Sequence, residues 1–153
     1  VRQPNAHSVH LRQFPETPAS WRDDVAAEQM EKLRDVRSAV TQALEEARAA
    51  KRIGSSLEAA PVVHIFDEEL RALVESVDFA ELCITSAVDV RGGPEVALGD
   101  SKAPVIVTIE KAPGVKCARS WKYFDPATAD PRYPDITLRD AEAVAEWDAA
   151  RGV

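Results

Sequence analysis

Apolar residues recur at intervals of three and four in the first third of the chain and form one continuous stripe. Ser20 is a suitable N-cap, and Asp23 and Asp24 follow it where negative charge meets the positive end of a helix dipole. Gly54 is a suitable stop. The pattern predicts a helix over residues 21–52. Its stripe consists of Met30, Leu33, Val36, Val40, Ala43, Leu44 and Ala47.

The expected helix follows an extended lead-in and is long for so small a protein. Prolines at positions 4, 15 and 18 favour an extended or turning course over residues 1–20. At about 1.5 Å per residue the helix would measure about 47 Å, more than a small domain covers alone. The first residue is Val1 rather than Met. We therefore expect a longer parent chain whose neighbouring segments cover part of the stripe.

Short apolar runs with β-branched residues replace the helical pattern further along the chain. Pro61–Phe66 predicts a strand, and Asp67 begins a short amphipathic helix. Leu82–Val90 predicts a second strand and Val105–Ile109 a third, which together would form a small mixed or antiparallel sheet. The remainder is irregular until a short helix predicted over Leu138–Trp147. The fold class expected is α+β.

The elements divide into three regions. Residues 1–54 hold the lead-in and the long helix, residues 55–112 hold a small α+β module, and residues 113–153 form a terminal segment that ends in a helix.

Composition and charge restrict the class of protein. The chain has 153 residues, 45% hydrophobic and 29% charged, which is typical of a globular protein. Its net charge of -7 excludes a generally basic nucleic-acid coat, so any RNA contact must be local. The two cysteines suit free thiols in a reducing cytosol. Apolar runs are far shorter than the roughly 18 residues of a membrane span. We expect a cytoplasmic protein with no membrane partner.

The segment Val115–Tyr123 interleaves two aromatic residues with three cations. Trp121 and Tyr123 could stack on unpaired bases while the cations hold phosphates, which is typical of RNA-binding surfaces. The alternative is that Trp121 forms the core of a small knuckle and the cations are its solvated rim. The cations are Lys116, Arg119 and Lys122.

Several strings in the chain resemble, in order, the C-terminal region of bacterial isoleucyl-tRNA synthetase. The more specific ones are Ile53–Ala59 and Lys116–Trp121, whose order and separation follow the family pattern. The others are Ser8–Leu11, Phe14-Pro15, Leu33–Val36 and Leu44–Arg48. The resemblance covers most of the chain.

The resemblance implies a part of a class I ligase that joins isoleucine to its tRNA with ATP and Mg. In that family the chain end comprises the last helices of the anticodon-binding bundle, a small α+β module and a terminal zinc knuckle near the anticodon stem and loop. The family's nucleotide-binding strings, of the His-x-Gly-His and Lys-Met-Ser-Lys-Ser types, are absent from these residues. The expected fragment is therefore non-catalytic, with an isoleucine-accepting tRNA and the rest of the parent synthetase as its partners.

One departure from the family pattern concerns the knuckle, which normally has two Cys-x-x-Cys pairs. Here the first pair reads Cys117-Ala118-Arg119-Ser120, and the resemblance puts Thr137 and Asp140 in the second. Hydroxyl groups are poor zinc ligands, so we expect a metal-free zinc-knuckle-like segment. We also expect an aromatic cluster, with Trp147 packed against Trp121 or Tyr123, to hold it closed.

The basic end of the long helix has two interpretations. Arg48, Lys51 and Arg52 either complement the helix dipole or also contact the tRNA backbone.

Two other classes of protein remain possible for the whole chain. One is the nucleic-acid-binding end of a DNA-repair glycosylase, because some of these enzymes also end in a Cys-x-x-Cys knuckle. The other is a free-standing protein-interaction module.

Overall fold

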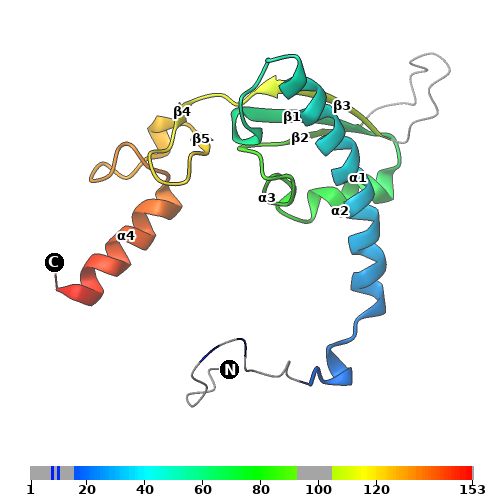
Figure 1. Cartoon of the computed structure of the whole chain (residues 1–153), viewed down its shortest axis with the longest axis horizontal. Coiled ribbons are helices and arrows are strands. Elements are labelled where there is room, and N and C mark those ends of the chain that lie inside the picture. Colours follow the sequence, from blue (N-terminus) through cyan, green and yellow to red (C-terminus); the bar gives the residue numbers. More distant parts are fainter. Residues whose placement is uncertain (1–7, 9, 11–15, 93–104, 153) are drawn as a thin grey trace.

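The computed structural model describes residues 8, 10, 16–92 and 105–152 and has the expected α+β architecture. Figure 1 shows a module, in which a long helix lies beside a small sheet and two short helices, and a separate C-terminal unit with a hairpin and a final helix. The lead-in predicted over residues 1–20 lies mostly outside the described residues. Within residues 16–92 and 105–152, short 3-10 helices lie at Ala19–Trp21, Ser56–Glu58 and Pro126–Thr128.

Helix α1 (Asp24–Ala49) is shorter than predicted at both ends. Asp23, and not Ser20, is the N-cap, because its carboxylate accepts a hydrogen bond of 2.9 Å from the backbone N–H of Ala26. At the other end the chain leaves the helix through Lys51, whose φ of 57° is in the left-handed region. The prediction that Gly54 ends the helix is therefore wrong.

The apolar stripe of α1 is buried only from Leu33 onward. The buried members lie against the sheet and the short helices and form the core of the module. Met30 and Val25, one and two turns upstream, are exposed. Among the described residues the N-terminal turns of α1 therefore extend past the module, as Figure 1 shows.

The sheet is mixed and has the order β2-β1-β3. Its central strand β1 (Ala59–Ile65) pairs in parallel with β2 (Asp89–Arg91) and antiparallel with β3 (Val105–Lys111). Helix α2 (Glu68–Glu75) follows β1 at once, because Asp67 caps it by accepting a hydrogen bond of 2.7 Å from the N–H of Leu70.

The strand predicted over Leu82–Val90 is mostly absent. Its first residues end helix α3 (Phe79–Cys83), which Asp78 caps by accepting from the N–H of Glu81 at 3.0 Å. Ile84 then adopts a left-handed φ of 57°, which no strand residue has. The N-cap thus overrides the β-branched composition of this segment, and strand pairing begins only at Asp89.

The C-terminal unit consists of strands β4 (Val115–Lys116) and β5 (Tyr123–Phe124) and helix α4 (Leu138–Arg151). Gly114, with φ of 95°, precedes the hairpin, and a Cβ atom there would lie 2.1 Å from the carbonyl oxygen of Phe124. Only glycine fits this turn. Helix α4 continues four residues past the predicted end at Trp147.

None of the helices within residues 16–92 and 105–152 combines the length and the apolar character that crossing a membrane requires.

Candidate nucleic-acid interface

The segment Lys116–Tyr123, called the tip below, is a closed loop between β4 and β5. The N–H of Cys117 donates to the carbonyl of Lys122 at 2.8 Å, and the N–H of Trp121 donates to the carbonyl of Cys117 at 3.1 Å. These bonds hold Trp121 at a φ of 64°, a left-handed conformation that aromatic residues rarely adopt. The backbone of the tip therefore fixes the direction in which the Trp121 side chain leaves the main chain.

The indole of Trp121 is directed into solvent and is 62% exposed. The Nζ atom of Lys116 lies 5.5 Å from the centroid of its ring, within cation–π range. The alternative in which Trp121 forms the core of the knuckle is therefore wrong. The buried centre of the C-terminal unit is instead Cys117, Ile136 and Ala141, with Phe124, Tyr133 and Val144 packed against them.

Trp147, which we expected to pack against Trp121 or Tyr123, lines a hollow on the C-terminal unit together with Arg119 of the tip. Trp147 is 57% exposed on α4, and the guanidinium carbon of Arg151 lies 3.9 Å from its ring centroid. Tyr123 is half-buried in β5. The unit therefore closes around a small aliphatic and thiol core rather than around a cluster of tryptophans.

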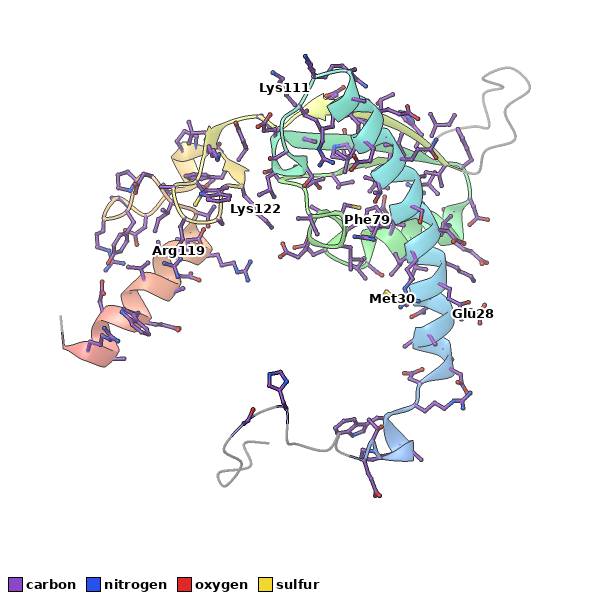
Figure 2. The ribbon with its side chains drawn as sticks, viewed as in Figure 1. Glu28, Met30, Phe79, Lys111, Arg119 and Lys122 are labelled. Carbon is purple, nitrogen blue, oxygen red and sulfur yellow. The ribbon has the colours of Figure 1, made fainter. Side chains whose placement is uncertain are left out.

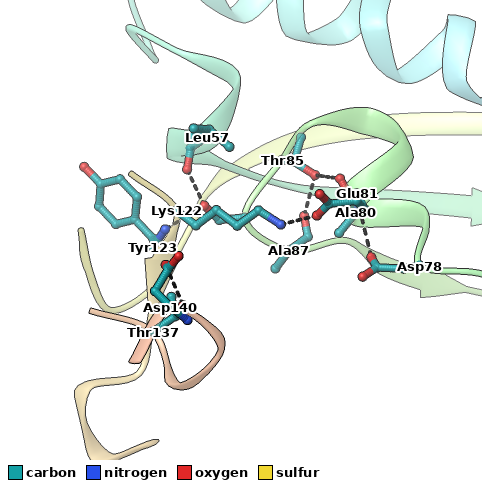
Figure 3. Close-up of polar contacts among 11 residues, drawn as sticks. Leu57, Asp78, Ala80, Glu81, Thr85, Ala87, Lys122, Tyr123, Thr137 and Asp140 are labelled. Atoms are coloured by element: carbon teal, nitrogen blue, oxygen red, sulfur yellow. Dashed lines mark hydrogen bonds and ion pairs between the residues drawn. The ribbon is translucent and has the colours of Figure 1, made fainter. Parts of the chain in front are cut away.

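Lys122 and Tyr123 join the tip to the module (Figure 3). The ammonium group of Lys122 pairs with the carboxylate of Glu81 on α3. The N–H of Tyr123 donates to the hydroxyl of Ser86 at 2.7 Å, and this hydroxyl donates to the carbonyl of Leu57 at 2.6 Å. We call these contacts the junction, and Figure 2 shows Lys122 on the side of the C-terminal unit toward the module.

The predicted basic residues of the long helix lie on the module and not in the tip. Arg48 forms an ion pair with Glu45 one turn back. Lys51 and Arg52 are exposed in the turn after α1, where the N–H of Arg52 donates to the carbonyl of Ala47 at 2.9 Å. The structure thus brings together the five predicted residues of the tip and leaves the three helix residues as a separate group.

Asp140 lies at the base of the tip, where Arg119 approaches it. The Nε atom of Arg119 is 3.6 Å from a carboxylate oxygen of Asp140, while its own side chain stays 59% exposed. Burial of the Asp140 carboxyl tends to raise its pKa. The hydroxyls of Ser120 and Thr137, the thiol of Cys117 and the charge of Arg119 outweigh that effect and hold the pKa below its usual value.

Known proteins of one name are similar to this chain over nearly its whole length. A sequence from Agrobacterium fabrum named isoleucine–tRNA ligase is 52% identical over 153 residues, which is 98% of this chain and 16% of that protein. Sequences of the same name from Brucella abortus and Bradyrhizobium diazoefficiens are 53% and 50% identical over 152 and 151 residues. These cover 97% and 96% of this chain, and 16% and 15% of the relatives.

This chain is homologous to a C-terminal part of isoleucine–tRNA ligase. The resemblance stated from the sequence strings is confirmed. The chain spans about one sixth of the length of the ligases it matches. None of the protein-family models matches the chain.

The ligase resemblance did not reveal Ser86 and Glu81, the module side of the junction. They lie 37 and 41 positions from their partners in the tip, and neither belongs to a motif. One signal was readable: Thr137 and Asp140 have the three-residue separation of a helix cap, and the hydroxyl of Thr137 accepts from the N–H of Asp140 at 3.2 Å.

Proposed function

We propose that this chain is the tRNA-binding C-terminal part of a cytoplasmic isoleucine–tRNA ligase. The parent enzyme would join isoleucine to its tRNA with ATP and Mg at sites outside these residues. The chain itself would be non-catalytic and would hold the anticodon region, so that the tRNA is oriented for the reaction elsewhere. The supporting facts are the names of the relatives and the geometry of the tip.

The observation that carries the proposal is the exposed indole of Trp121. It stands in solvent on a left-handed residue whose backbone is closed by hydrogen bonds, with the Lys116 ammonium over its ring. A rigid exposed aromatic ring with an adjacent cation suits an unpaired base next to a phosphate.

The other residues of the tip have different parts in this proposal. Arg119 is exposed enough to reach a phosphate while Asp140 orients it. Lys122 is only 28% exposed and its charge is compensated by Glu81, so a phosphate would have to displace that carboxylate. We assign Lys122 and Tyr123 to placing the tip against the module.

The basic group Arg48, Lys51 and Arg52 is proposed as an auxiliary contact to the tRNA backbone. Lys51 and Arg52 are exposed and follow the C-terminus of α1, where they also complement the helix dipole. Reversing both charges in the parent ligase should weaken tRNA binding and reduce its salt dependence. Loss of thermal stability with unchanged tRNA affinity would instead assign them a purely structural role.

The test of the main proposal is the substitution Trp121→Ala in the parent ligase. Loss of one stacking contact, about 1–3 kcal/mol, should raise the Kd for isoleucine-accepting tRNA by about 5- to 150-fold. The kcat/KM for aminoacylation should fall with it. Isoleucyl-adenylate formation, measured by pyrophosphate exchange, should keep its rate, because the chemistry lies outside this chain.

Trp147→Ala is the matched control. It removes the same side chain, at a similar exposure and also beside a cation, from α4 rather than from the tip. It should raise the tRNA Kd much less than Trp121→Ala does, because Trp147 lies beside Arg119 but is not one of the base-stacking rings of the tip. Equal losses in the two variants, or no loss in Trp121→Ala, would contradict the assignment of the tip.

The two other classes of protein are less well supported. The relatives at 47–53% identity bear the ligase name, and none of those compared here bears the name of a DNA-repair glycosylase. They are also about six times longer than this chain, which argues for a part of an enzyme over a free-standing interaction module.

A further inference from the structure

The four residues at the knuckle positions converge on one small volume at the base of the tip. The sulfur of Cys117 lies 3.2 Å from Oδ2 of Asp140, and the hydroxyl of Thr137 lies 2.7 Å from the same oxygen. The N–H of Ser120 points at the sulfur at 3.4 Å. Two segments that are 20 residues apart are thus tied together through a single carboxylate.

The second pair of positions also begins helix α4. Thr137 is the N-cap of α4 and Asp140 lies in its first turn, at the spacing that a Cys-x-x-Cys pair would have. The hydroxyl of Thr137 both accepts from the N–H of Asp140 and donates to its carboxylate. A helix cap therefore supplies the acceptor for the thiol of the other segment. Figure 3 shows the Thr137 and Asp140 side chains of this cap.

The donor atoms do not fit a zinc ion. A closed tetrahedral site uses deprotonated thiolates or imidazoles, whereas this set has one sulfur, one carboxylate and two hydroxyls. At 3.2 Å from an ionised carboxylate oxygen the sulfur is a thiol that donates its proton, since two negative charges would repel each other. The described residues contain no group of three or more His, Cys, Asp or Glu arranged to hold a metal.

The hydroxyl oxygen of Ser120 is buried and has no hydrogen-bond partner of good geometry. It nevertheless lies close enough to Asp140 to favour the ionised carboxylate. A serine hydroxyl can donate to this same carboxylate, so the buried oxygen does not require an ion.

We propose that the Asp140 carboxylate closes this knuckle in place of a metal ion, by accepting hydrogen bonds from the thiol of Cys117 and the hydroxyl of Thr137. Charge-assisted hydrogen bonds are the strong ones in proteins, and the Asp140 side chain is 16% exposed, which limits competition from water. The core of Cys117, Ile136 and Ala141 lies directly against this carboxylate cluster.

The first arm of the test measures metal dependence in the unaltered 153-residue chain. After incubation with zinc and desalting, plasma emission spectroscopy should find less than about a tenth of a zinc ion per chain, because one thiol cannot match four thiolates. EDTA should leave the melting temperature unchanged. One stoichiometric zinc per chain, or a melting temperature that EDTA lowers, would overturn the proposal.

The second arm replaces the acceptor with Asp140→Asn, whose amide removes the charge and keeps the size. Amide hydrogen exchange in residues 115–124 should accelerate by about tenfold or more, since a hydrogen bond to a charged group contributes about 1.5–3 kcal/mol. Exchange in β1 should not change. Glu142→Gln is the control, because Glu142 is an exposed carboxylate on the same helix. Equal exchange in the two variants would refute the role of Asp140.

Discussion

At the scale of single residues, a few side chains set the local backbone by hydrogen bonding to it. Asp23, Asp67, Asp78 and Thr137 each cap a helix through an oxygen that accepts an N–H three residues on. In the loop before α4, the Asp130 carboxylate accepts from the backbone N–H two residues on and from the guanidinium of Arg132. Short polar side chains therefore determine where several elements of this chain begin.

The loop at Asp130 gives a prediction about pH. Hydrogen bonds from the guanidinium and the backbone N–H of Arg132 lower the pKa of Asp130 to about 2. A carboxyl with a lowered folded-state pKa stabilises the fold above its ordinary value, and that contribution is lost as the pH falls toward 2. Carboxyl-carbon NMR should show Asp130 titrating near 2 in the native chain. Arg132→Ala should move the midpoint back toward the ordinary value, and an unmoved midpoint would show that the pair is not the cause.

At the scale of elements, helix α1 shows how a stop signal can be misread. Gly54 was the expected terminator, yet the left-handed residue is Lys51, where a Cβ atom is strained. Lys51→Gly should raise the free energy of unfolding by about 0.5–1 kcal/mol, because relief of this strain exceeds the greater unfolded-state entropy of glycine.

Urea denaturation measures the effect of Lys51→Gly. Lys51→Ala is the matched control, since it removes the same ammonium and keeps the Cβ atom. If both variants gain equal stability, the cause is the lost charge and not the backbone conformation.

The sequence predicted the elements that have a regular pattern of hydrophobic residues. It did not predict helix α3, whose start is set by the hydrogen bond of its N-cap residue. The stripe of α1, strand β1 and strand β3 were each foreseen close to their observed positions. Helix α3 was missed, because one N-cap at Asp78 outweighs a β-branched run. Within the candidate site, the residue type of Trp121 suggested a role in binding, but its exposure depends on a left-handed backbone that its neighbours impose and that no periodicity signals.

At the scale of the whole molecule, the junction holds the C-terminal unit against the module through few contacts. Ser86 is its central residue, since one hydroxyl links Leu57 and Tyr123. Ser86→Ala should leave the Tyr123 N–H without its acceptor, which costs about 1–3 kcal/mol for a buried donor. Hydrogen exchange in residues 115–124 should accelerate by about 5- to 150-fold while exchange in β1 keeps its rate.

Ser76→Ala is the control for the junction. The Ser76 hydroxyl also donates to a backbone carbonyl, that of Leu73 at 2.7 Å, but within the end of α2. It should leave exchange in residues 115–124 unchanged. In the parent ligase, Ser86→Ala should also weaken tRNA binding if the orientation of the tip matters, whereas Ser76→Ala should not.

The double hydrogen bond at Ser86 has an evolutionary consequence. The Ser86 hydroxyl donates to the carbonyl of Leu57 within the module, but it accepts a second hydrogen bond only if a backbone donor arrives from a stretch of chain 37 positions later. In descendants that had shed everything after residue 112, selection for serine at position 86 would relax, and other small residues would accumulate there. The identity of one partly buried side chain at the junction would thus reveal whether a given lineage still carries the distant appendage.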